Sequence, residues 1–351
     1  MPDLPPQFTA WPEQHPQLDS NGLLMAYSAG WRGCFPNPEA KERVAAKLMS
    51  EHGYGSISDA AHANGWADSG AGKLVIPFVF IRKLWPKAFP GDAQQVGSCV
   101  SHSTKNAALL TLACELVSGK PDPVTGKLEG IPDVPPEGEE SGVLSPAPIY
   151  WSRGYNGDGW SCGEAAERIV DTVGLVVAKN YPNLGVDLTN VTRSIEHLYG
   201  SKKPPEAWQT EFAAHKIHSV AEVGSFEELR DGLFNGYGAS TCGSEGWSST
   251  RNEDGVSKRS GSWSHAMACL GVDDRDTTKA KYGEPLVWNQ NSWGNWNSGP
   301  LRIMGTEIDA LPGGFWTTWS SYKRRDIFLL SNVAGWPART LPSYGFEQGL
   351  N

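Results

Sequence analysis

The sequence predicts an α+β fold in which a helix-rich part of the chain precedes a strand-rich part. Helical periodicity is clearest in residues 103–117, where apolar side chains recur at spacings of three and four. Two short apolar runs with the character of buried strands, residues 261–272 and 285–288, come much later. Segregation of helices and strands along a chain is typical of α+β proteins.

The N-terminal region is predicted to hold an extended arm followed by two helices. Residues 1–36 are interrupted by Pro and Gly and carry isolated aromatic side chains. A helix is predicted over residues 39–52, Gly53 ends it, and either Ser56 or Ser58 caps a second, shorter helix. So small a pair of helices does not fold alone. It is therefore a prosegment, a docking arm or a permanent part of the body.

The rest of the chain divides by the same patterns. A strand is predicted over residues 73–80 and a solvated loop insertion, rich in Pro and Glu, over residues 118–142. Further helices are predicted over residues 145–153, 162–173, 190–199 and 226–234, and further strands over residues 238–242 and 326–330. The predicted division is an arm (1–72), a helical lobe (73–235), a β-rich lobe (236–333) and a tail (334–351).

Cys99 is the candidate nucleophile because it begins the predicted central helix. Gly97 and Ser98 form a turn of small residues before it, and Ser98 is a plausible N-cap. Lowering a thiol pKa from about 8.5 to about 3.5 requires about 6–7 kcal/mol. A helix end supplies at most about 2 kcal/mol. A cationic partner is therefore required, and histidine is the usual one.

His265 is the candidate partner because of the strands predicted around it. It lies in the apolar run 261–272, and the next run leads directly into Asn291 and Trp293. A hairpin made of the two runs brings the amide of Asn291 beside the imidazole of His265, with Trp293 covering both. These are the nucleophile, base and orienting group of a cysteine hydrolase.

At these residues the sequence resembles the papain family of cysteine peptidases, of bacterial or bacteriophage type. The matching motifs are Gly97-Ser98-Cys99, Ser264-His265-Ala266 and Asn291-Ser292-Trp293-Gly294, in the family's order. The resemblance covers roughly residues 73–330. It implies a papain-like, two-lobed fold with a buried central helix in the helical left lobe and a β-rich, barrel-like right lobe.

The resemblance also implies roles for individual residues. Cys99, His265 and Asn291 are the expected catalytic residues, and the backbone N–H of Cys99 is one oxyanion donor. Ala93 stands where the family has its oxyanion glutamine, so either Gln94 or Gln95 is expected to supply the second donor. The expected substrate contacts are Gly157, Gly159, Ser264 and Trp293. The substrate is a peptide or protein, and no cofactor or metal is expected.

Composition excludes several other classes of protein. A net charge of −9 and a pI near 5.4, without a cluster of Lys and Arg, argue against nucleic-acid binding. No apolar run is long enough to span a membrane, and the first residues lack the layout of a signal peptide. We expect a cytoplasmic protein, with association with a virion left open. The scattered cysteines are expected to be buried, reduced thiols.

A different class of function stays open alongside the peptidase. The missing propeptide motif, the displaced glutamine and the aromatic terminal segments fit a structural component of a larger assembly, such as a bacteriophage particle. In that case Trp11, Trp31 and Trp336 are candidate interface anchors. His102, one helical turn beyond Cys99, is expected on the helix surface, with modulation of the thiolate as the alternative.

Overall fold

The structure is a computed structural model of the chain, and all that follows concerns the residues it describes. These are residue 34 and residues 37–85, 93–118, 144–153, 159–171, 173–200, 202–214, 217–306 and 308–344. Predictions for the arm before Cys34, the loop insertion 118–142 beyond the end of the central helix, Gly157, Trp11 and Trp31 fall outside them.

The elements of the described chain follow one another in mixed order. The helices are α1 (Pro38–His52), α2 (Ile57–Ala63), α3 (Phe78–Leu84), α4 (Cys99–Ser118), α5 (Ala147–Trp151), α6 (Cys162–Asp171), α7 (Arg193–Glu196), α8 (Gln209–Ala214), α9 (Phe226–Phe234), α10 (Asp276–Tyr282) and α11 (Trp319–Tyr322). The strands are β1 (Leu74–Val75), β2 (Asn180–Tyr181), β3 (Val186–Asp187), β4 (Ser219–Glu222), β5 (Ala239–Arg251), β6 (Ser257–Asp273), β7 (Leu286–Gln290), β8 (Gly314–Thr318) and β9 (Asp326–Ser331). The 3-10 turns are η2 (Pro182–Leu184) and η3 (Glu206–Trp208).

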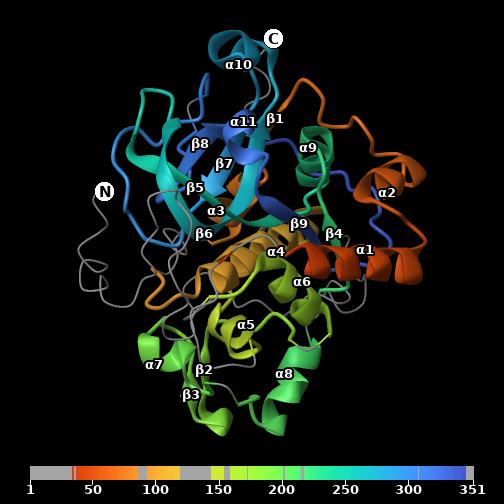
Figure 1. Cartoon of the computed structure of the whole chain (residues 1–351), viewed down its shortest axis with the longest axis vertical. Helices are drawn as coiled ribbons and strands as arrows, with labels where there is room; N and C mark the ends of the chain where they lie inside the picture. The colour runs from red at the N-terminus through yellow and green to blue at the C-terminus, as the bar shows by residue number, and fades with distance from the viewer. Residues whose placement is uncertain are drawn as a thin grey trace.

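Helix α4 is the central element of the molecule. Every residue from Cys99 to Glu115 is buried, because the helix packs on β5, β6 and β9 and also contacts α3, α5 and α6 (Figure 1). A helix enclosed on all sides is a core helix rather than an amphipathic surface helix. Its contact with β5 is close: a Cβ at Gly238 would lie 2.1 Å from the carbonyl oxygen of Ala107.

An antiparallel sheet packs against α4. In the described residues it has seven strands in the order β4–β9–β5–β6–β7–β8, with β1 also paired to β6. Strands β5 and β6 form a long hairpin, whose pairs run from Ala239 opposite Cys269 to Arg251 opposite Ser257. Strand β6 also pairs with β7, and Gln290 at the end of β7 lies opposite Ala268 on β6. The segment that follows β7 therefore begins near the middle of β6.

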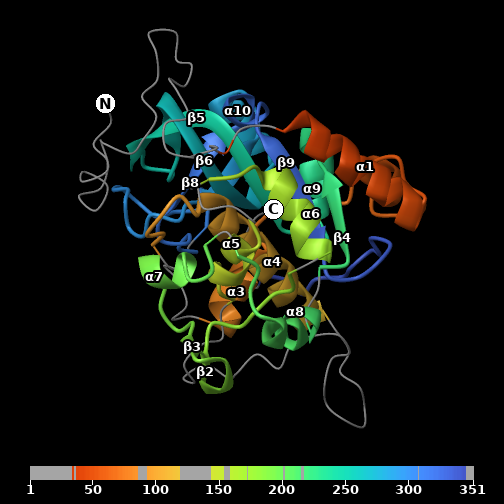
Figure 2. The same ribbon diagram turned by 60° about the horizontal axis from the view of Figure 1, so that its bottom comes forward.

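A smaller group of elements lies on the other side of α4 from the sheet. Helices α5, α7 and α8 gather there with the β2–β3 pair (Figures 1 and 2). They have their own apolar core, in which the rings of Trp151 and Trp208 lie 5.2 Å apart. The α+β class and the buried central helix predicted from the sequence are confirmed in this architecture of a long helix packed on an antiparallel sheet.

The N-terminal helices pack on the body of the molecule. Helix α1 lies beside β4 and α6 (Figure 2) and is capped by the side chain of Asn37, while Gly53, with φ of 74°, ends it as predicted. Helix α2 is capped by Ser56 and packs on α9. The segment after α2 is fixed by the carboxylate of Asp231, which accepts hydrogen bonds from the backbone N–H groups of Asp68 and Gly70.

Three sequence predictions are wrong. The strand over residues 73–80 is only β1, because the chain turns into α3 after Pro77, which adopts helical angles; short apolar runs do not distinguish strand from helix. His102 is 1% exposed rather than on a helix surface. Trp336 is fully buried against Tyr237, with ring centroids 4.9 Å apart, so it is part of the core and not an exposed anchor.

Candidate active site

The predicted nucleophile stands at the start of α4. The carbonyl of Ser98 accepts the first helical hydrogen bond, from the N–H of His102 at 3.1 Å, so Ser98 is the N-cap by backbone position. Its hydroxyl lies 3.5 Å from the carbonyl oxygen of Val96 rather than on the helix. The N–H groups in the first turn of a helix have no hydrogen-bond partner within that helix, and Cys99 lies in this turn of α4.

The predicted base and its orienting amide are in contact. Nε2 of His265, on β6, lies 2.8 Å from Oδ1 of Asn291, the residue after β7. An amide oxygen only accepts, so Nε2 carries the proton of a neutral ring and Nδ1 is the nitrogen that faces the thiol. The same Oδ1 accepts from the N–H of Ser292 at 2.7 Å, which fixes the orientation of the amide.

Aromatic rings cover this pair. The ring of Trp293 lies 4.4 Å from the imidazole of His265 between centroids, with an interplanar angle of 31°. The ring of Trp263 packs against that of Trp293 at an interplanar angle of 51°, and Trp296 contacts Trp293 in a T-shaped arrangement. Exclusion of water from one side of the His265–Asn291 hydrogen bond strengthens it, since its electrostatic part increases as the local dielectric constant falls.

The pKa of Cys99 is held well below its ordinary value. The largest cause is a hydrogen bond from the thiol of Cys34, and the hydrogen bond and positive charge of His265 and the N–H of Ala266 act in the same direction. Burial of the side chain opposes them. The arrangement therefore favours the thiolate of Cys99 paired with His265, which is the activated state of a nucleophilic cysteine.

Cys34 is a member of the site that the sequence analysis missed. Its Sγ lies 3.3 Å from Sγ of Cys99, and its backbone N–H donates to Oγ of Ser264 at 3.0 Å. The pKa of Cys34 is raised well above its ordinary value, first by burial and then by the contact with Cys99. Nothing in the local sequence distinguishes this cysteine, because its role comes only from tertiary contact.

The two candidate oxyanion glutamines lie in different surroundings. Gln94 is buried: its Nε2 donates to the carbonyl of Val96, and its Oε1 accepts from the hydroxyl of Ser292 at 2.6 Å. Gln95 is exposed, and its amide donates to the carbonyl of Ala93. Gln94 is thus the one held against the Asn291–Ser292 segment.

A buried hydrogen-bonded pair lies beside the nucleophile loop, residues 93–98, which leads into Cys99. Nε2 of His102 lies 3.2 Å from Oε1 of Glu196, and both side chains are enclosed. The other oxygen of Glu196 accepts from the backbone N–H of Gln95 at 3.3 Å. Glu196 therefore connects α7 to both α4 and the loop that leads into Cys99.

A buried arginine supports the strand that carries His265. Nη2 of Arg325 donates to the carbonyl oxygen of His265 at 2.6 Å, and Nη1 lies 3.7 Å from Oε2 of Glu245 on β5. Its Nε donates to the hydroxyl of Thr241. Arg325, like Glu196, had no motif around it by which the sequence analysis would have found it.

The predicted substrate contacts are only partly described. Gly159 is described and adopts a positive φ of 81°, a conformation that suits glycine. Ser264 precedes His265 and bonds to Cys34, and Trp293 covers the imidazole. Within the described residues, no group of three or more His, Cys, Asp or Glu side chains is arranged to hold a metal ion. No described helix has the length and apolar character needed to cross a membrane.

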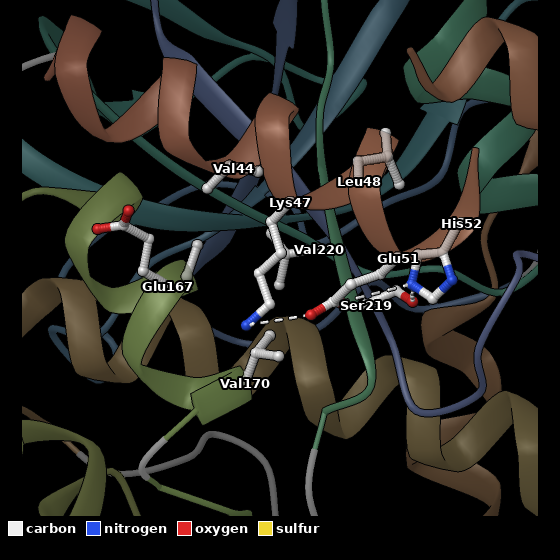
Figure 3. A pocket seen from close by; sticks show the side chains of 10 residues that line it. Val44, Lys47, Leu48, Glu51, His52, Glu167, Val170, Ser219 and Val220 are labelled. Atoms are coloured by element: carbon white, nitrogen blue, oxygen red, sulfur yellow. Dashed lines mark hydrogen bonds and ion pairs between the residues drawn. The ribbon is translucent and has the colours of Figure 1, made fainter. Parts of the chain in front are cut away.

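The hollows found elsewhere do not include these residues. A cavity of about 20 Å³, room for one water, lies between α1, α6 and β4, with Leu48, Val170 and Val220 on its walls (Figure 3). At its mouth Lys47 lies 3.8 Å from Glu51. A wider surface hollow of about 470 Å³ is lined by Arg82 together with residues 300–302, 309, 310 and 312.

Comparison with known proteins finds likeness in architecture alone. No protein-family model and no curated protein matches the chain. Among solved structures, xylellain, a cysteine protease from Xylella fastidiosa, aligns with a TM-score of 0.49 at 15% identity over 89% of this chain and 99% of that one. Digestive procathepsin L 3 of Tenebrio molitor larval midgut aligns with a TM-score of 0.38 at 13% identity, over 84% and 88%. Procathepsin B S9 from Trypanosoma congolense aligns with a TM-score of 0.38 at 11% identity, over 77% of each chain.

Proposed function

We propose that this protein is a cysteine peptidase or amidase that acts through Cys99, His265 and Asn291. The observation that supports the proposal most is the position of the His265 imidazole between Asn291 and Cys99. His265 bonds to Oδ1 of Asn291 at 2.8 Å, and it faces a thiol whose pKa it lowers. A thiol, a base and an orienting group in series form the arrangement that nucleophilic catalysis requires.

The proposed reaction follows from the chemistry of these groups. The thiolate of Cys99 attacks an amide carbonyl, and the protonated His265 gives its proton to the leaving amine. Water, deprotonated by His265, then hydrolyses the thioester. The backbone N–H of Cys99 and the side chain of Gln94 are the proposed donors to the oxyanion, each such donor contributing about 100- to 1000-fold in rate.

The proposed substrate is a peptide or protein in an extended conformation. Gly157 and Gly159 are the proposed backbone partners of the substrate, because main-chain pairing requires no side chain at those positions. Ser264 and Trp293 are the proposed contacts beside the scissile bond.

Alkylation of the folded protein by iodoacetamide tests the proposal. Cys99 should be carboxamidomethylated faster than the other cysteines and at lower pH, and His265→Ala should slow its labelling. The same preparations should hydrolyse an unstructured protein such as casein, and Cys99→Ser should not. Labelling of Cys99 only in the pH range of an ordinary thiol, together with absent hydrolysis, would contradict the proposal.

A further inference from the structure

Cys34 lies as close to Cys99 as a reacting substrate carbonyl would have to come. A reacting carbonyl must come within about 3–3.5 Å of the nucleophile, and Sγ of Cys34 is 3.3 Å from Sγ of Cys99. Cys34 is held there by Oγ of Ser264, which accepts from its N–H and lies 3.7 Å from its sulfur. Three residues on, the N–H of Asn37 donates to the carboxylate of Asp326 on β9, at 3.0 Å.

We propose that Cys34 and Cys99 form a redox pair, in which a peroxide joins the two sulfurs in a disulfide that closes the site and a thiol reductant reopens it. The regulatory meaning of this pair rests on the proposed peptidase function, while its chemistry does not. The modification sites are the two sulfurs, and the small-molecule reactant is hydrogen peroxide or an organic hydroperoxide.

The geometry is close to that of a bond. A disulfide requires an S–S separation of about 2.05 Å, so the two sulfurs have to approach by roughly 1.3 Å from their present 3.3 Å. Rotation about the Cα–Cβ bonds supplies movements of this size. The backbone contacts of Cys34 with Ser264 on β6 and of Asn37 with Asp326 on β9 keep the backbone near Cys34 in place, and Cys99 is held in α4.

The two thiols have complementary reactivity. The hydrogen bond from Cys34 and the charge of His265 keep the pKa of Cys99 low, whereas burial keeps the pKa of Cys34 high. Peroxides react with thiolates, so oxidation begins at Cys99, which is 5% exposed, and not at Cys34. Cys34 is then the resolving thiol, adjacent to the oxidised sulfur.

The steps balance in atoms and electrons. The thiolate of Cys99 takes one oxygen from the peroxide and becomes a sulfenic acid, and the hydroxide that leaves takes a proton from His265. The sulfur of Cys34 then attacks the sulfenic sulfur, and the hydroxide displaced from it leaves as water with the thiol proton of Cys34. In sum, two thiols and one hydrogen peroxide give one disulfide and two waters, and an organic hydroperoxide gives an alcohol in place of the first water. A dithiol reductant reverses the bond by thiol–disulfide exchange.

A second buried thiol pair provides an internal comparison. The N–H of Cys162 lies 3.5 Å from Sγ of Cys242, and burial together with the contact with Cys242 raises the pKa of Cys162 well above its ordinary value. Cys162 is therefore protonated at neutral pH and reacts slowly with peroxide. Proximity of sulfurs alone does not predict oxidation, and the lowered pKa of Cys99 distinguishes the proposed pair.

The test is oxidation of the full chain, reduced and then freed of reductant, with one equivalent of hydrogen peroxide at pH 7. Non-reducing digestion and mass spectrometry should reveal a peptide that joins Cys34 to Cys99 and has lost two hydrogen atoms. Casein hydrolysis should fall as this peptide accumulates, and both should revert with dithiothreitol. With an excess of peroxide, Cys34→Ser should instead accumulate sulfenic, sulfinic and sulfonic acid on Cys99, and dithiothreitol should reduce the first of these and not the other two. Cys114→Ser, at a remote buried thiol, should behave as the wild type.

Two outcomes would overturn the pair: oxygen accumulating on Cys99 of the wild-type protein with Cys34 still reduced, or a Cys162–Cys242 disulfide forming first. The mass readout does not depend on activity. A reversible Cys34–Cys99 disulfide in a protein that hydrolyses nothing would therefore support the redox pair and contradict the peptidase. Hydrolysis without the disulfide would do the reverse.

Discussion

The backbone of His265 is held by Arg325, whose Nη2 donates to the His265 carbonyl oxygen at 2.6 Å from a fully buried guanidinium. The donor comes from the segment just before β9 and the acceptor from β6. The strand pairing alone does not link these two residues, since β5 lies between their strands. The position of the proposed base therefore depends on a buried charge that the strand pairing does not supply.

Replacement of that arginine should damage both stability and the site. Arg325→Met leaves Glu245 buried without its partner and removes the support of His265, so we expect a loss of about 3–5 kcal/mol in the free energy of unfolding. Urea denaturation measures this loss. Alkylation of Cys99 in the folded fraction should also slow at low pH. Arg339→Met is the matched control, because Arg339 pairs with buried Glu115 near the other end of α4. It should lower stability and leave the alkylation profile of Cys99 unchanged.

The thiolate should persist at low pH, and Cys34 should be part of the reason. Because the pKa of Cys99 is lowered in the folded protein, alkylation should continue below the pH range of an ordinary thiol and stop only as the pH falls through the lowered pKa. For the same reason, the contribution of this thiolate to folding stability is complete above the unfolded pKa and is lost as the pH falls through the folded pKa.

Two variants at Cys34 test whether its hydrogen bond to Cys99 sets the pH range of alkylation. Cys34→Ala removes the largest cause of the lowered pKa, so the midpoint of the alkylation profile should move to higher pH. Cys34→Ser keeps a hydroxyl donor, so its midpoint should stay closer to that of the wild type. Identical midpoints for Cys34→Ala and the wild type would show that His265 alone activates Cys99.

The two glutamines should differ sharply in their effect on catalysis. Gln94→Ala should lower kcat by about 100- to 1000-fold with a smaller change in KM, as the loss of an oxyanion donor does. Gln95 is exposed, and its side-chain amide donates to the carbonyl of Ala93, so Gln95→Ala should change kcat by less than about threefold. A reversed order of the two effects would assign the donor to Gln95.

Glu196 should act as a positioning residue for the nucleophile loop. Glu196→Ala leaves His102 and the N–H of Gln95 without an acceptor, and we expect a loss of about 1–3 kcal/mol in stability together with a lower kcat. Glu196→Gln keeps an acceptor oxygen and should recover most of the kcat. If Glu196→Ala lowered stability and left the kcat of the folded fraction unchanged, the residue would be structural only.

Local patterns predicted the parts of the site that lie in continuous motifs. Cys99 follows small residues at a helix start, and the strands around His265 and Asn291 are apolar runs that pair as a hairpin does. Helix α9 spans the residues predicted for it, because its cap, Ser225, and its apolar spacing agree.

Tertiary contacts decided what sequence patterns did not predict. Glu196 reaches His102 from 94 positions away, and Cys34 reaches Cys99 from 65. The prediction that His102 lies on a helix surface is wrong, because most helices have an exposed face whereas α4 is enclosed on all sides. The helix α3 was missed because its apolar residues are too few to reveal a helical period.

The order of the site along the chain has a consequence during synthesis. The thiol of Cys99 leaves the ribosome well before β6, β7 and the Arg325 segment, which hold the proposed base in place. Until that last segment has emerged and joined the sheet, Cys99 is an ordinary thiol in an incomplete chain. A nascent chain halted before Arg325 would therefore carry the proposed nucleophile without the support of its proposed base, so a reactive Cys99 would report that the sheet around His265 has assembled.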